Sequence, residues 1–289
     1  MQQPIDYAGM FPPAKLPLNE AVDEYVEFME GEDAWIANRF ICAQGNLGDL
    51  AEHWSSFREY EEDILPLVVV GAPLGANAGE ALASLKQDVD KHDGILEVSG
   101  FEAKLESGSA LKALKKSQDW FADQEIELFL ECGWGEGYLD LVGEAASTLD
   151  EVGIKARMGG VEAAAFPSVD EVSDFIVEVA SLELPFKFTA GLHEPLRYFD
   201  ENLDCHHHGF LNVFAASLLA VTLDAGKSTV SEVLSIEDSA GFEFKEGGFT
   251  VANQSVGLDD IGLWWSYFRG FGSCSLQEPI DGLKRLGLW

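Results

Sequence analysis

The sequence predicts an α/β fold, specifically a (β/α)8 TIM-type barrel, and three observations support this prediction. Short apolar runs typical of strands recur at intervals of roughly 30 residues. Segments with apolar residues at helical spacing lie between these runs. Eight such runs fit the 289-residue length of one closed barrel. We therefore expect a single barrel domain over residues 1–289.

The eight expected strands are short runs of apolar or alternating residues, most of them bounded by Gly, Pro or polar residues. They are Ile5–Met10, Asn38–Ala43, Pro66–Gly71, Ile95–Ser99, Ile126–Glu131, Ile154–Met158, Phe186–Ala190 and Phe271–Ser275.

The expected helices are marked by capping residues at their starts and by glycines after their ends. Asn19 begins the first, and Gly94 and Gly153 follow two others. The marked helices are Asn19–Met29, Ala78–Lys91, Tyr138–Val152, Val169–Leu182 and Phe210–Leu223.

An insertion is expected at residues 228–257, between strands 7 and 8. It contains a hairpin pattern, Phe242–Lys245 and Phe249–Ala252 around Glu246-Gly247-Gly248. An aromatic helix, Asp259–Arg269, would then return the chain to the barrel. Its aromatic residues favour a core or homodimer contact over a binding surface.

The charge balance argues against several classes of partner. Eighteen Lys and Arg face 51 Asp and Glu, which gives a net charge of -33. Nucleic acid and an anionic membrane surface are therefore unlikely partners. No apolar run reaches the ~18 residues of a membrane span, so we expect a cytoplasmic protein. The four cysteines lie far apart, and we expect neither a metal nor a cofactor.

Two lysines on apolar strands are the main functional clue. Lys155 lies on strand 6 and Lys187 on strand 7. Gly159 follows Lys155 by four positions, and Gly191 follows Lys187 by four positions. Burial among apolar walls lowers the pKa of a lysine and supplies a neutral amine for nucleophilic or base chemistry. We therefore expect Lys155 to act as nucleophile or base and Lys187 to tune its pKa.

Alternation along strands 5, 6 and 7 turns Glu131, Lys155, Arg157 and Lys187 toward a common interior. The three cations, Lys155, Arg157 and Lys187, outnumber the single acid, Glu131, and the surplus positive charge would bind an anionic substrate. Glu131 would transfer protons. The alternative is a buried ion network in which Glu131 ties the strands together.

Further polar residues follow the strand ends. His193, Arg197 and His208 are expected to orient an anionic group, and Asn212 lies near the start of its helix, where an anion could meet free N–H groups. The alternative for Asn212 is a plain helix cap. The histidines at positions 206–208, together with His193, also raise a metal hypothesis.

Glycines near the strand ends are candidates for phosphate binding. Gly159 and Gly160 either admit a phosphate or allow a tight turn, and Gly272 with Ser273 forms a second candidate turn. Arg39 on strand 2 is a further candidate, with an ion pair to a nearby acid as the alternative.

Four segments together resemble a family of bacterial barrel proteins to which no activity is assigned. They are residues 7–14, Pro185–His193, His208–Val213 and Gly272–Ser275, and the resemblance extends over the whole chain.

A local resemblance is to deoxyribose-phosphate aldolase. That family carries a Schiff-base lysine on strand 6, a second lysine on strand 7 and a Gly/Ser phosphate turn, which Lys155, Lys187 and Gly272-Ser273 match. The family's Lys-Thr-Ser-Thr-Gly-Phe is Lys-Ala-Arg-Met-Gly-Gly here. The resemblance implies a lysine imine formed with a small carbonyl compound.

Three functions follow from these patterns. The first is a lyase or aldolase-like enzyme that acts on a small anionic carbonyl or sugar derivative through a lysine. The second is a metal-dependent hydrolase or isomerase that uses Glu131, His193 and His208. The third is a barrel that binds a small ligand without catalysis.

Overall fold

The computed structural model describes residues 3–57 and 64–289. Eight parallel strands form a closed barrel, which confirms the predicted fold class. In barrel order the strands are β1 (Ile5–Tyr7), β13 (Phe268–Ser273), β7 (Phe186–Thr189), β6 (Gly153–Arg157), β5 (Glu127–Cys132), β4 (Leu96–Leu105), β3 (Leu65–Val70) and β2 (Ala37–Ala43).

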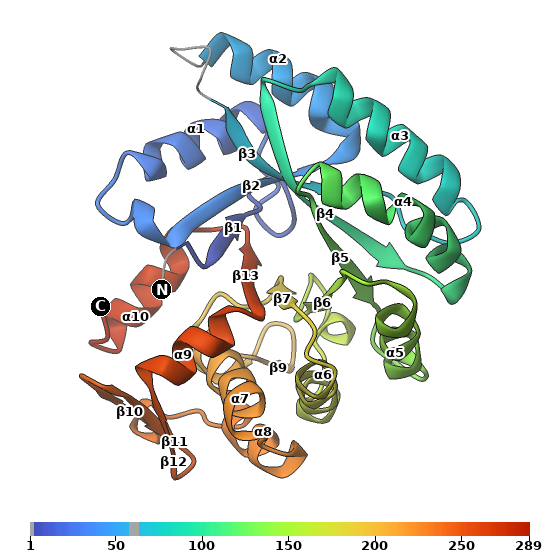
Figure 1. Ribbon diagram of the computed structural model, residues 1–289. Coiled ribbons are helices and arrows are strands. Elements are labelled where there is room, and N and C mark those ends of the chain that lie inside the picture. Colours follow the sequence, from blue (N-terminus) through green and yellow to red (C-terminus); the bar gives the residue numbers. More distant parts are fainter. Residues whose placement is uncertain (1–2, 58–63) are drawn as a thin grey trace. The chain divides into compact units, whose positions relative to one another are not determined.

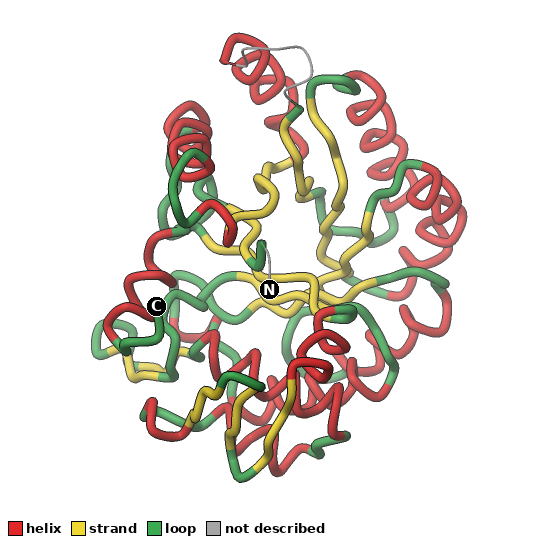
Figure 2. Tube along the Cα trace, turned by 60° about the vertical axis from the view of Figure 1, so that its left-hand side comes forward, coloured by secondary structure: helices red, strands yellow, loops and turns green. Residues whose placement is uncertain are grey.

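The chain divides into two compact units, residues 2–155 and residues 156–289. Strands and helices alternate along most of the chain, as Figure 2 shows in yellow and red. Short 3-10 helices lie at Ala34–Ile36, Gln44–Asn46, Gly108–Ala110, Ala163–Ala165 and Ser239–Gly241.

In the first unit, helices cover the outer side of strands β1 to β5 (Figure 1). They are α1 (Leu18–Met29), α2 (Leu47–Phe57), α3 (Ala78–Lys91), α4 (Leu111–Asp123) and α5 (Tyr138–Thr148). The strands present apolar side chains to these helices, and Tyr7, Tyr25 and Phe40 pack their rings together with centroids about 6 Å apart.

Strand β4 runs six residues past the predicted end at Ser99. Glu102 lies within this extension and is 1% exposed. A buried carboxylate breaks the apolar pattern that marks a strand, and this explains why the sequence pattern stopped short.

The second unit contains α6 (Val169–Ser181), α7 (Phe210–Leu223), α8 (Lys227–Leu234), α9 (Leu258–Trp265) and α10 (Gln277–Arg285). Helix α6 begins at a capping box, in which Ser168 Oγ accepts from Glu171 N and the Glu171 carboxylate accepts from Ser168 N. Helix α9 ends at Trp265, four residues before the predicted Arg269, because Phe268 already begins β13.

Two small antiparallel sheets accompany the second unit. The predicted hairpin is confirmed as β10 (Phe242–Lys245) and β11 (Gly248–Val251), and a third strand, β12 (Gln254–Gly257), pairs with β11. A second hairpin, β8 (Tyr198–Asp200) with β9 (Cys205–His207), was not predicted. Across residues 3–57 and 64–289, every helix is too short or too polar to cross a lipid bilayer.

Candidate functional site

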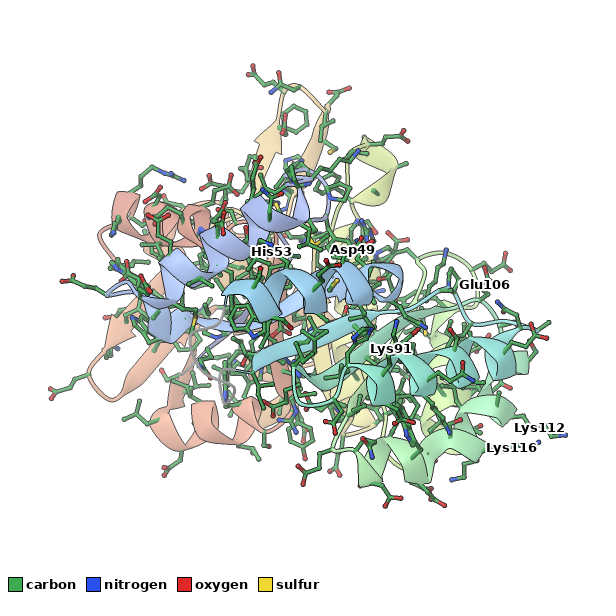
Figure 3. The ribbon with its side chains drawn as sticks, turned by 90° about the horizontal axis from the view of Figure 1, so that it is seen from above. Asp49, His53, Lys91, Glu106, Lys112 and Lys116 are labelled. Carbon is green, nitrogen blue, oxygen red and sulfur yellow. The ribbon has the colours of Figure 1, made fainter. Side chains whose placement is uncertain are left out.

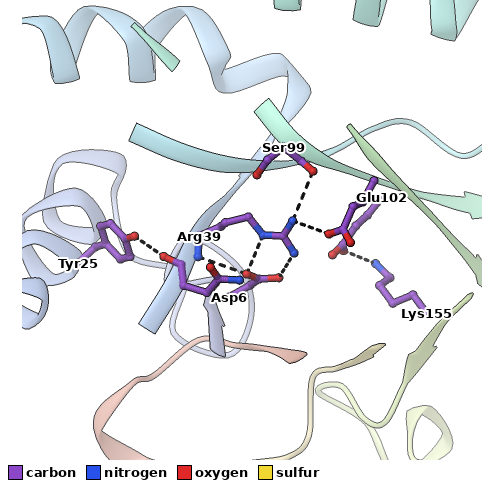
Figure 4. Close-up of polar contacts among 8 residues, drawn as sticks. Asp6, Tyr25, Arg39, Ser99, Glu102 and Lys155 are labelled. Atoms are coloured by element: carbon purple, nitrogen blue, oxygen red, sulfur yellow. Dashed lines mark hydrogen bonds and ion pairs between the residues drawn. The ribbon is translucent and has the colours of Figure 1, made fainter. Parts of the chain in front are cut away.

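Lys155 lies between two carboxylates in the first unit. Its Nζ is 2.9 Å from Glu102 Oε2 and 2.9 Å from Glu131 Oε2. Lys155 pairs in register with Glu131 on the neighbouring strand, whereas Glu102 comes from β4, one strand further away (Figure 4). The ion pair between Lys155 and Glu131 is the contact expected from the alternative, a buried ion network, and Glu102 is a partner that the sequence pattern did not indicate.

The predicted lowering of the Lys155 pKa is wrong. Burial lowers the pKa of Lys155, but the charges of Glu102 and Glu131 and their hydrogen bonds raise it by more, so the net shift is upward. Lys155 is therefore an ammonium at neutral pH. It differs from Lys91, Lys112 and Lys116, which lie exposed on helices α3 and α4 (Figure 3).

Arg39 forms a second buried ion cluster in the same unit (Figure 4). Its Nε and one terminal nitrogen donate to the two oxygens of Asp6 at 3.1 and 3.0 Å, and the other terminal nitrogen lies 3.0 Å from Glu127 Oε2. This is the ion pair expected as the alternative role of Arg39. The paired oxygens fit the planar guanidinium, so the cluster joins β1, β2 and β5.

The second unit brings a histidine and a carboxylate together at its strand ends. Strands β7 and β13 are parallel neighbours, with Thr189 opposite Gly272, so their carboxyl ends lie side by side. His193 follows β7, and Glu278 lies in the first turn of α10 after β13. His193 Nδ1 is 2.6 Å from Glu278 Oε2, and this bond lowers the pKa of Glu278.

This pairing fixes how His193 can react. Because the carboxylate can only accept, Nδ1 carries the proton and Nε2 keeps its lone pair in the neutral ring. In the described part of the chain, no protein group bonds Nε2, and the side chain is 23% exposed. His193 therefore keeps one ring nitrogen outside the contact with Glu278, on a side chain that is partly exposed.

A second histidine pairing lies in the β8–β9 hairpin. Tyr198 Oη is 2.8 Å from His207 Nδ1, and Asp200 Oδ2 is 3.7 Å from His207 Nε2. The Asp200 charge favours a proton on Nε2, so we assign Tyr198 as the donor to Nδ1. Burial lowers the pKa of His207, and the ring of Phe166 stacks on it at 3.9 Å.

The charge of Glu278 acts on Tyr198. Burial, followed by the charges of Asp200, Glu194 and Glu278, raises the pKa of Tyr198 to about 12. The charge of His193 also acts on the pKa of His207. Two histidines, a tyrosine and their carboxylates thus form one cluster of titratable groups, which we call the histidine–tyrosine cluster.

The other predicted anion-binding residues serve the fold in this structure. Asn212 is fully buried: its Oδ1 accepts from Arg197 N at 2.9 Å, and its Nδ2 donates to the Val233 and Ile236 carbonyls. Arg197 binds Glu237 Oε1 at 2.5 Å. These contacts hold the hairpin to α7 and α8, and substrate binding by Asn212 and Arg197 stays a prediction.

His208 is held as a neutral ring. Its Nε2 donates to the Pro167 carbonyl at 2.9 Å, and burial lowers its pKa to about 4. The Nδ1 atom is buried and makes no hydrogen bond to any described residue. A role for His208 in substrate binding stays a prediction.

The glycines at the strand ends allow close backbone packing. Gly191 has a φ of +71°, and a Cβ there would lie 2.7 Å from the Met158 carbonyl oxygen and 2.9 Å from Gly159 Cα. A Cβ on Gly160 would meet Ala165. Close packing therefore leaves no room for a side chain at Gly159 or Gly160, and phosphate binding by these glycines stays a prediction.

Ser273, which follows Gly272, uses its hydroxyl locally. Its Oγ donates to the Ser275 carbonyl at 2.7 Å and accepts from Ser275 N.

Lys187 is fully buried on β7, whereas Arg157 is exposed at the end of β6. Their predicted roles beside Lys155 and Glu131 stay predictions.

No group of three or more His, Cys, Asp or Glu side chains within residues 3–57 and 64–289 is arranged to hold a metal ion. The chain matches no protein-family model, and no curated protein sequence matches it. The chemistry of the histidine–tyrosine cluster is therefore the main guide to function.

Proposed function

We propose that the protein is an enzyme that transfers protons on a small anionic carbonyl compound or sugar derivative, with His193 as the base. The hydrogen bond between His193 Nδ1 and Glu278 Oε2, at 2.6 Å, is the observation that carries this proposal. A carboxylate on Nδ1 stabilises the imidazolium that forms when Nε2 takes a proton. The pair also follows the carboxyl ends of two barrel strands, where barrel enzymes place their reactive groups.

Tyr198 supplies the second proton-transferring group of the proposed reaction. With a pKa of about 12, its phenol keeps its proton at neutral pH. Such a phenol is matched in acidity to an enolate oxygen, which forms when a carbon beside a carbonyl loses its proton. Tyr198 then donates to that oxygen instead of to His207 Nδ1.

An anionic substrate is supported by one exposed cation of this unit. Arg157 is exposed at the carboxyl end of β6, and the Met158 N–H donates to the Thr189 carbonyl, which joins the ends of β6 and β7. In a chain with a net charge of -33, an arginine at this position offers a local site for a carboxylate or phosphate group.

The imine route is a weaker proposal. Lys155 is an ammonium between two carboxylates, so it does not supply the free amine that imine formation needs. Any lysine imine is therefore proposed at Lys187, which is buried on β7 between Phe186 and Phe188.

Deuterium exchange tests the proposal across a panel of candidate substrates. The protein is incubated in D2O with keto acids, aldehydes and sugar phosphates, and proton NMR follows the loss of the hydrogen beside each carbonyl. We expect the wild-type protein to catalyse exchange in at least one compound. His193→Gln should lower the rate by about 100-fold or more.

Two further variants sharpen this test. Glu278→Gln should slow exchange and shift its pH profile, because the amide no longer stabilises the imidazolium. His206→Gln is the control, since His206 is an exposed histidine of the β8–β9 hairpin that carries Tyr198. Exchange that is equally fast in His193→Gln, or no exchange of any compound by the wild type, contradicts the proposal.

A further inference from the structure

An apolar cavity of about 250 Å³ lies in the second unit, apart from the histidine–tyrosine cluster. Helices α7 and α9 form two of its walls, and strands β10 and β11 form the third. Phe214 and Leu218 line it from α7, Phe242 and Phe249 from the sheet, and Trp264 from α9. These elements place large apolar side chains around a space that they do not fill.

The interior of this cavity offers almost no polar partner. Lys245 is the one charged residue among the described residues that line it, and its ammonium lies 3.0 Å from Glu243 Oε2. A bound water needs two to four polar partners, so water is poorly held in such a space. A charged or strongly polar group would lose its hydrogen bonds on entering.

The wall at Trp264 is fixed in place. Trp264 Nε1 donates to Ser217 Oγ at 3.0 Å, and its ring stacks on Phe268 with centroids 4.4 Å apart. Movement of this side chain into the cavity would break both contacts. The cavity is therefore a built feature of the packing between α7 and α9.

The entrance is also apolar. Phe244 and Leu258 line the cavity and are 50% and 64% exposed. Lys245 also lines the cavity, but its ammonium is already paired with Glu243 Oε2 at 3.0 Å, so in a chain with a net charge of -33 a carboxylate gains little attraction there.

We propose that this cavity binds one alkyl chain of roughly eight carbons that carries an uncharged polar end group. An apolar cavity of about 150 Å³ admits benzene, so the larger cavity here accommodates a longer chain. The alkyl chain lies among the aromatic side chains, and the hydroxyl or sugar end group stays at the entrance. This site is independent of the proton-transfer proposal.

Calorimetric titration with octan-1-ol, octyl glucoside and octanoate tests the site in the intact protein. We expect one molecule of either neutral compound to bind, and octanoate to bind about tenfold more weakly. Equal binding of octanoate contradicts the neutral end group. Absence of binding by all three compounds overturns the proposal.

Ala215→Phe tests the location, because Ala215 lines the cavity and the larger ring fills it. Binding should fall at least about tenfold. Ala122→Phe makes the same change on the exposed face of α4 and should leave binding unchanged. Equal binding by wild type and Ala215→Phe places the ligand elsewhere and overturns the proposal.

A second variant covers the case in which Ala215→Phe does not fold. Leu218→Ala enlarges the same cavity, so the preference for decan-1-ol over octan-1-ol should rise. An unchanged chain-length preference counts against the site. A dimer seen by sedimentation that dissociates on Phe244→Ser, without alkyl binding, would identify the surface as a contact between two copies instead.

Discussion

Lys155 and Glu102 form a buried ion pair across an intervening strand. Their Nζ and Oε2 atoms are 2.9 Å apart, and Lys155 belongs to β6, Glu102 to β4, with β5 between them. Glu131 of β5 completes the contact at 2.9 Å. One ammonium thus joins three consecutive strands, and this geometry is the basis of the first two predictions.

Lys155→Met should lower the free energy of unfolding by about 3–5 kcal/mol, because it removes a buried cation that faces two carboxylates. Lys115→Met is the matched control. It breaks an ion pair of similar length with Asp150, 2.8 Å, on an exposed surface, where solvent screens the charges, and should destabilise the protein far less. Urea denaturation measures the free energy of unfolding of both variants. Equal losses in the two variants would show that burial of the Lys155 ion pair adds nothing to its effect on stability.

Imine trapping should not label Lys155. The raised pKa of Lys155 keeps it protonated, and an ammonium has no lone pair with which to attack a carbonyl. After treatment with aldehydes or keto acids and borohydride, mass spectrometry should find Lys155 labelled no more than the surface Lys116. Selective labelling of Lys155 would show that the two carboxylates do not control its reactivity, whereas labelling of Lys187 would support the imine proposal.

Acid should destabilise the protein through His208. The pKa of His208 is about 4 in the folded protein and about 6.5 in an unfolded chain, so the unfolded chain binds more protons between these values. The stabilising contribution is fully present above about pH 6.5. It is lost as the pH falls toward 4, by about 3 kcal/mol in total.

Denaturation of His208→Gln between pH 7 and 4 checks this prediction, since the variant should lose that part of the pH dependence. His206→Gln removes an exposed neighbour whose charge is the smallest of the causes that shift the His208 pKa, so it should change the slope far less. A His208→Gln profile parallel to the wild type would contradict the assigned cause.

Two glycine substitutions should have opposite effects. Gly191→Ala should destabilise the protein by about 1–3 kcal/mol, because Gly191 has a positive φ and its Cβ would meet the Met158 carbonyl oxygen. Gly143→Ala should stabilise it by about 0.5–1 kcal/mol, since Gly143 lies within helix α5 with no atom within 4 Å of a new Cβ. Thermal unfolding measures both, and a stabilising Gly191→Ala would contradict the packing argument.

Much of the fold could be predicted from the sequence because its local patterns are strong. Helices Ala78–Lys91 and Phe210–Leu223 have the predicted bounds, and the apolar strand at Leu65–Val70 lies within one residue of its prediction at each end. The β8–β9 hairpin was missed because its strands have three residues each and its second strand, Cys205–His207, contains two histidines. Such segments carry no apolar alternation.

The site was less predictable because its contacts join distant parts of the chain. Alternation correctly placed Glu131 beside Lys155, its neighbour in register. Glu102 is 53 residues from Lys155 in the sequence. Because its charge was not anticipated, the sequence predicted a lowered Lys155 pKa, whereas the pKa is raised. The His193–Glu278 contact spans 85 residues, and its one available signal was the adjacency of the strands that precede each residue.

The β8–β9 hairpin carries titratable groups outside the barrel and its surrounding helices. Tyr198, Asp200 and His207 all lie within ten consecutive residues, on strands that belong to neither the barrel nor its surrounding helices. Replacement of this short segment would exchange Tyr198, Asp200 and His207 and would leave His193, Glu278 and the barrel strands in place. Related chains could therefore keep this barrel and differ in the phenol and imidazole groups of one short, exchangeable loop.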